Sequence, residues 1–155
     1  MPEPEPEEEK AVGARYPGYE FPIERGKIRE FARATMSHNP DYLDDPFPVI
    51  TPTGLMAGGA WAPDDSASFL QLIDFDPARL LHAGQEFRFP GPPPRAGDVL
   101  TTESWVDRRY EKEGKRGGTM RFAEIVVSYR NAEGTVVAEA LMTLIETARP
   151  PTDAS

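Results

Sequence analysis

The chain has 155 residues, enough for one domain with a proper hydrophobic core. Its net charge of −9 argues against a nucleic-acid partner, because phosphate binding needs clustered lysine and arginine. It has no cysteine, no cluster of metal ligands and no apolar run of roughly 18 residues, so we expect a cytoplasmic protein without metal, cofactor or membrane partner.

The N-terminal residues 1–12 are Pro-Glu repeats that cannot bury apolar area, which predicts a disordered acidic tail. A folded domain is expected over 13–147, followed by a C-terminal tail over 148–155. Within the domain, 16–23 is aromatic and contains two prolines, so it is expected to be an extended edge segment rather than a helix.

An amphipathic helix is expected from about Glu24 to Met36. Pro40 cannot donate a backbone hydrogen bond and pushes Asn39 out of the α region, so the helix is expected to stop at this turn. Its apolar face is formed by four residues at i, i+3, i+4 and i+7: Ile28, Phe31, Ala32 and Thr35.

A second helix is expected to start near Gly54 but to be short or broken, because Gly58 and Gly59 weaken it and Pro63 stops it. It is expected to restart around Ser66 to Ile73. From about residue 80 onward the pattern alternates as in β-strands, with a Gly97-Asp98 turn and a bulge expected near Ala123.

The order of these features resembles the MaoC-like hydratase/dehydratase family of hotdog folds over about residues 12–147. It is most similar to the N-terminal-type, non-catalytic half of heterodimeric enoyl-thioester hydratases. The resemblance implies an α+β fold: a single hotdog domain whose antiparallel sheet wraps a short or broken central helix. Such domains pair so that their two sheets form one continuous sheet.

The catalytic motif of that family reads Asp-x-Asn-Pro-x-His. Here Asn39-Pro40 match, but Ser37 stands at the Asp position and Tyr42 at the His position. Hydrating an enoyl thioester needs one group that takes a proton and one that delivers it. Neither Ser37 nor Tyr42, whose unperturbed pKa is about 10, is a base at neutral pH. A displaced pair, His38 with Asp41, is the alternative; otherwise both belong to a solvated turn.

The resemblance also implies substrate-binding positions. Gly54 stands where the family offers a helix-terminal N–H to the thioester oxygen; the alternative is that it only turns the chain. For His82, at the head of a strand, the implied role is substrate binding, and the alternative is that its side chain only lines the strand end. A broken central helix leaves room for a large acyl group, unless Trp61, Phe69 and Leu72 refill that space. The full set of expected substrate-binding residues is Asn39, Thr53, Gly54, Trp61 and His82.

The main hypothesis is therefore an accessory subunit of a heteromeric enoyl-CoA hydratase, a lyase complex of lipid metabolism. Its partner would be a catalytic MaoC-like subunit, in a heterodimer or heterotetramer, with acyl-CoA as the substrate. The acyl group is expected to be bulky, as in steroid side-chain degradation, or fatty, as in fatty or mycolic acid dehydration. The alternatives are an interaction module that tethers another enzyme, and a self-sufficient hydratase or thioesterase that uses His38 and Asp41.

Overall fold

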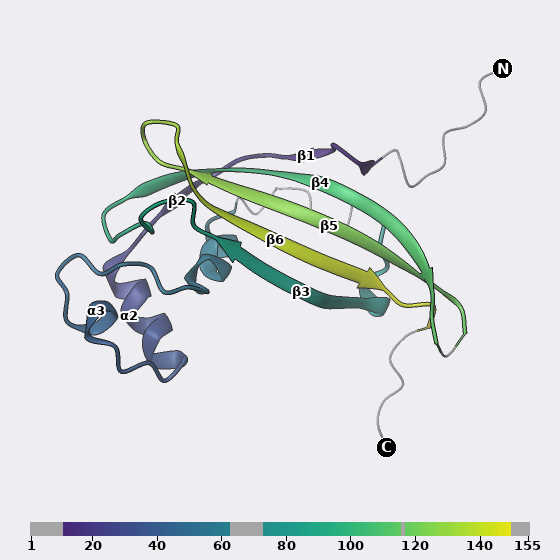
Figure 1. Cartoon of the computed structure of the whole chain (residues 1–155), viewed down its shortest axis with the longest axis horizontal. Helices are drawn as coiled ribbons and strands as arrows, with labels where there is room; N and C mark the ends of the chain where they lie inside the picture. Colours follow the sequence, from purple (N-terminus) through teal and green to yellow (C-terminus); the bar gives the residue numbers. More distant parts are fainter. Residues whose placement is uncertain (1–10, 63–72, 116, 150–155) are drawn as a thin grey trace.

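The computed structural model describes residues 11–62, 73–115 and 117–149. Its centre is a six-stranded antiparallel sheet in which two short N-terminal strands both pair with the same long neighbour (Figure 1). This confirms the extended edge segment expected over 16–23. In chain order the strands are β1 (Arg15–Tyr16), β2 (Glu20–Pro22), β3 (Leu80–Arg88), β4 (Val99–Glu113), β5 (Thr119–Arg130) and β6 (Val136–Glu146).

The sheet order is β1-β4-β5-β6-β3, with β2 also on β4. The helical elements α2 and α3 lie on one side of the curved sheet, near the end of the sheet where β3 finishes (Figure 1). The architecture is the α+β hotdog arrangement that the sequence predicts, and its central helix is short. The helical segments that lie wholly within the described residues are α2 (Arg25–Ala34), α3 (Pro40–Leu43) and the 3-10 segments η1 (Gly54–Trp61) and η2 (Pro77–Arg79).

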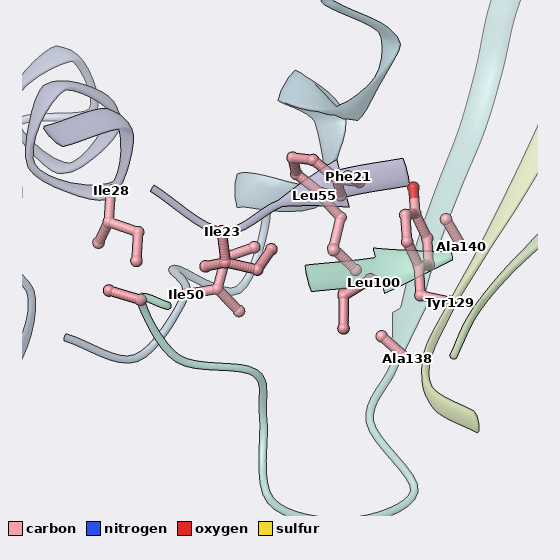
Figure 2. Close-up of a cluster of buried hydrophobic side chains, with 10 residues drawn as sticks. Phe21, Ile23, Ile28, Ile50, Leu55, Leu100, Tyr129, Ala138 and Ala140 are labelled. Atoms are coloured by element: carbon pink, nitrogen blue, oxygen red, sulfur yellow. The ribbon is translucent and has the colours of Figure 1, made fainter. Parts of the chain in front are cut away.

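The hydrophobic core joins the helical layer to the sheet. Ile28 of α2 and Leu55 of η1 belong to the same buried cluster as Leu100 and Tyr129 of the sheet (Figure 2). A second cluster lies nearer the other end of β5, around Val106 and Ile125. The alternating buried residues of β4 from Leu100 to Val106, together with those of β5 and β6, thus produce one buried sheet face.

Helix α2 ends earlier than expected, and for a different reason. Its last helical residue is Ala34, and Met36 adopts a left-handed φ of 56°. Ser37 N–H donates to the Ala32 carbonyl at 2.8 Å and Met36 N–H to the Arg33 carbonyl at 3.0 Å, the pair of bonds that defines a Schellman cap. The expectation that Pro40 stops this helix was therefore wrong.

Pro40 instead begins the next helix. It occupies the first helical position of α3, where a missing N–H costs nothing, and Asn39 is the N-cap. The N–H of Asp41 donates to the Asn39 side-chain oxygen at 3.0 Å. The Asn-Pro pair is thus a helix start as well as a turn.

The irregularity in the sheet also differs from the expectation. The register of β4 against β5 shifts between Val106 and Arg108, so the bulge lies in β4 at Asp107 and not in β5 near Ala123. The change of apolar parity in β5 arises because Phe122 is buried on the opposite face, where it stacks on Tyr110 with ring centroids 4.8 Å apart.

The charged network at one end of the sheet has a buried carboxylate at its centre. Glu146 is only 2% exposed, and its carboxylate is ion-paired to Arg79 at 2.6 Å and to Arg121. The backbone N–H of Asp76 donates to the same carboxylate at 2.9 Å. This network fixes the segment before β3 to the end of β6.

The first described residues contact the sheet. Ala11 is buried and the Gly13 N–H donates to the Val106 carbonyl at 2.8 Å, while Val12 is exposed. The acidic tail expected over 1–12 otherwise lies outside the described residues, as does most of the C-terminal tail and of the helix expected over Ser66 to Ile73. In the described ranges, no helix is long and apolar enough to cross a membrane.

Candidate functional site

The motif turn, residues 37–42 between α2 and α3, is held by hydrogen bonds from backbone N–H groups to side-chain oxygens. Asn39 N–H donates to the Ser37 hydroxyl at 3.4 Å, and the Asn39 side-chain oxygen accepts from Asp41 N–H. Tyr42 is half-buried and packs against the core cluster that contains Ile28. The residues at the Asp and His positions of the motif therefore have capping and packing contacts, and Asn39 uses its side-chain oxygen to start α3.

The displaced pair does not form a dyad here. His38 and Asp41 are both exposed, and no ion pair or hydrogen bond joins them in the part of the chain that the structure describes. A base whose orientation no second group fixes lacks the arrangement that general acid–base catalysis requires. The catalytic use of His38 and Asp41 stays a prediction that needs them to approach each other.

The start of η1 bears on the thioester-binding prediction. Gly54 N–H donates to the Thr51 carbonyl at 2.9 Å, so this group is already hydrogen-bonded. A methyl group at position 54 would lie 2.7 Å from the Thr51 hydroxyl oxygen and 2.9 Å from the Ile50 side chain, so any other residue would force these side chains to shift. Thr53 is the exposed N-cap of η1 and its side chain makes no capping bond. The contacts account for glycine at 54 by packing, and its role toward a thioester stays a prediction.

The remaining expected residues lie apart from this turn. His82 is exposed in β3, and its Nε2 lies 3.1 Å from the Gly84 carbonyl at a local register shift against β6. In Figure 1, β3 begins at the end of the sheet away from α2 and α3. The side chain of Trp61 lies outside the described part of the chain. His82 is therefore not gathered with Asn39 in one site within this chain.

A small hollow lies between α2, β2 and η1; the space inside it is about 20 Å³, enough for about one water molecule. Among the expected substrate-binding residues whose side chains are described, only Gly54 lines it. Thr51 also lines it and was missed by sequence reasoning; its only signal is that it is a hydroxyl residue beside Val49 and Ile50. The walls come from Phe21, Pro22, Ile23, Glu24, Lys27, Ile28, Phe31, Ile50, Thr51, Gly54 and Ala57.

Tyr129 belongs to the core cluster that contains Ile28, and Tyr19 packs against that cluster. Burial raises the pKa of Tyr129 far above its ordinary value, and the neighbouring Tyr19 adds to the effect. The pKa of Tyr19 is raised first by burial and then by Tyr16. Both phenols therefore stay neutral at physiological pH, and neither is suited to act as a base there.

Comparison with solved structures supports the fold. The C-terminally truncated HadBC complex of Mycobacterium tuberculosis, a 3R-hydroxyacyl-ACP dehydratase, matches with a TM-score of 0.69 at 23% identity, over 87% of this chain and 96% of that chain. The ChsH1-ChsH2 complex of the same organism matches with a TM-score of 0.68 at 13% identity, over 92% and 89% of the two chains. A protein described as a MaoC-like dehydratase gives 0.73 at 18% identity, and this chain spans 43% of its length.

A search of curated proteins finds no match. The family model described as "FAS1-like, dehydratase domain region" matches residues 10–140, which is most of the chain and includes the turn between α2 and α3, the strands β3, β4 and β5, and the first half of β6. The chain therefore belongs to this FAS1-like dehydratase region family and has the hotdog fold of the MaoC-like dehydratase structures that it matches.

Proposed function

We propose that the chain is the accessory subunit of a heteromeric enoyl-thioester hydratase, and that a catalytic MaoC-like subunit supplies the Asp and His that this chain lacks. One observation carries the proposal: Ser37 and Tyr42 replace the acid/base pair, while Asn39 and Pro40 are kept as the cap and first residue of α3. The turn thus keeps its structural residues and has lost its proton-transfer groups.

The partner would join at β3. This strand is nine residues long, lies at the end of the sheet order and pairs only with β6 in the described part of the chain. Its other edge offers backbone donors and acceptors to a second sheet. Leu81, which is 46% exposed, adds apolar area there. Support also comes from the HadBC and ChsH1-ChsH2 structures, which are complexes by their descriptions.

The substrate would be an acyl thioester carried by coenzyme A or by a carrier protein. A bulky acyl group, such as a steroid side chain, needs far more space than the small hollow beside η1 gives, so most of its pocket would lie between the subunits. The start of the chain's central helical segment favours this arrangement, because no atom of the described residues lies within 4 Å of a Cβ placed on Gly59 of η1. A long fatty acyl chain would follow the same path.

The test is reconstitution with a catalytic subunit. The chain, co-expressed with a MaoC-like hydratase that keeps Asp and His, is expected to co-purify and to raise hydration of enoyl-CoA. Leu81→Asp should weaken co-purification at least tenfold, whereas Val99→Asp, at a similarly exposed apolar residue (48% against 46%) in β4, should not. Binding without any effect on activity would favour the interaction module instead.

A further inference from the structure

Helix α2 carries three arginines along one side: Arg25, Arg29 and Arg33, spaced four residues apart. Four residues of α-helix rise about 6 Å, so the three side chains form an arginine row along the axis. The row lies beside the buried residues of this helix, and Ile28 among them points from α2 into the core (Figure 2). Arg25 and Arg33 are exposed, and Arg29 is half-buried. Helix α2 thus uses its apolar side for the fold and presents the arginine row next to it.

The arginine row has no partner within the chain. None of its three guanidinium groups forms an ion pair or a side-chain hydrogen bond in the part of the chain that the structure describes. The Nε of Arg29 is even buried without an acceptor. Lys27 on the same helix, by contrast, pairs with Glu30 at 2.8 Å. In a chain with 26 acidic residues against 17 lysines and arginines, three unpaired arginines in line are an exception.

The same arginines weaken the helix that carries them. Like charges four residues apart on a helix repel each other, and the row contains two such pairs. Arg25 also lies in the first turn, where the helix dipole favours carboxylates, and this turn has no acidic residue. Because these charges do not serve the stability of α2, they point to the binding of carboxylates from outside the described part of the chain.

The N-terminal segment, residues 1–10, has the matching charges. It contains five glutamates and one lysine. Glu3, Glu5 and Glu7 are spaced two residues apart, and the prolines between them favour an extended backbone, in which two residues span about 6–7 Å. This repeat is close to the repeat of about 6 Å in the arginine row. Three carboxylates of the segment can therefore face three guanidinium groups.

The reach of the segment favours binding to another copy. The Gly13 N–H donates to the Val106 carbonyl, and Pro22, just before α2, pairs with Val99. Along β4 these two contacts are about 24 Å apart, and the arginine row lies beyond the second (Figure 1). Glu7 lies within about 22 Å of Gly13 even in a fully extended chain. The segment would reach the row of its own chain only when fully stretched, whereas a second copy can offer all three glutamates without strain.

We propose that the arginine row on α2 binds the acidic N-terminal segment of a second copy of this chain through Glu3, Glu5 and Glu7. In a two-fold arrangement each copy binds the segment of the other, so two sets of ion pairs hold the two copies together. Exposed ion pairs are individually weak, so we expect a Kd of roughly 10–1,000 μM that rises with salt. The contact leaves the β3 edge open, and it depends on no catalytic subunit.

The test is analytical ultracentrifugation of the full-length chain over that concentration range. Two triple variants are compared with it: glutamine at all three glutamates, and glutamine at all three positions of the arginine row. Each is expected to weaken self-association at least tenfold, as is about 0.5 M NaCl. An equal mixture of the two variants should associate better than either alone, because one supplies the segment and the other the row. Reversing the charges of both sets in one chain should restore the association.

Two controls separate the contact from folding and from general charge. Arg25→Gln with Arg33→Gln keeps the half-buried Arg29, and its Tm should not fall, because it relieves the repulsion along α2. Arg108→Gln, Lys112→Gln and Lys115→Gln together remove three charges at the β4–β5 hairpin and should leave self-association unchanged.

Three results would overturn the proposal. The first is a natural chain that stays monomeric over the whole range, with or without amide shifts in α2 that would place the segment on its own chain. The second is a glutamate variant that associates as the natural chain does, which would assign the arginine row to other carboxylates. The third is a hairpin variant that weakens association as much as the row variant does.

Discussion

The left-handed Met36 that ends α2 gives a sharp stability prediction. Replacement by glycine should stabilise the protein, because Met36 holds a φ of 56° with its side chain 82% exposed, so almost no packing is lost. A non-glycine residue in the left-handed region costs about 1–2 kcal/mol. About 0.5–1 kcal/mol of the gain is lost again, because glycine gives the unfolded chain more conformational freedom. The net expectation for Met36→Gly is about 0.5–1 kcal/mol of added stability.

The assay is urea and thermal unfolding of the two chains side by side. For a chain of this length, that gain raises Tm by about 1–4 °C and moves the urea midpoint without changing the slope. Met36→Ala is the control: it keeps the unfavourable φ and removes only exposed atoms, so it should match the natural chain within about 0.5 kcal/mol. A loss of stability in Met36→Gly would mean that the methionine side chain makes contacts that outweigh its backbone cost, and the cap argument would fail.

Three further outcomes follow from the fold. Glu146→Gln should lower the free energy of unfolding in urea by about 3 kcal/mol. This is the lower end of the range for breaking a buried ion pair, because the arginine partners are 30% and 29% exposed. A loss under about 1 kcal/mol would mean that the network does not stabilise the fold. Because the pKa of Tyr129 is raised in the folded chain, the stability that its neutral phenol contributes is complete below about pH 10. Above that pH the stability falls by up to about 1.4 kcal/mol per pH unit. Tyr129→Phe should reduce this alkaline loss of stability, and an unchanged slope would mean that other groups cause the loss. Gly59→Leu should lower kcat/KM of the reconstituted complex at least tenfold more for a polycyclic enoyl-CoA than for crotonyl-CoA. Gly58→Leu should instead lower Tm, because a Cβ at this position would lie 3.5 Å from Phe21 and Tyr19. Equal losses of kcat/KM for both substrates in Gly59→Leu would place η1 away from the acyl path.

The sheet could be predicted from the sequence because its signal is local. Alternation through Gln85, Phe87 and Phe89 and again along β4, β5 and β6 marks strands whose one face is buried. The weak central helix was equally readable, since Gly58 and Gly59 remove helix propensity, and the chain forms only the 3-10 segment η1 there.

The details of the site were not readable, because they depend on non-local or unusual backbone geometry. A methionine rarely adopts positive φ, so the cap at Met36 has no sequence signature, and the sequence points to Pro40 as the end of the helix instead. The bulge at Asp107 is set by pairing with a strand some twenty residues later. Thr51 became noticeable only when the fold placed it beside Gly54 with no partner for its hydroxyl.

The most direct measurement of the central claim is turnover by the purified chain alone, with crotonyl-CoA and with a bulky enoyl-CoA. Because Ser37 and Tyr42 stand in place of the acid/base pair, we expect no hydration above the uncatalysed rate, and activity only when a catalytic subunit is added. Robust turnover by the chain alone that is lost in His38→Ala would contradict the account and assign the chemistry to His38 and Asp41.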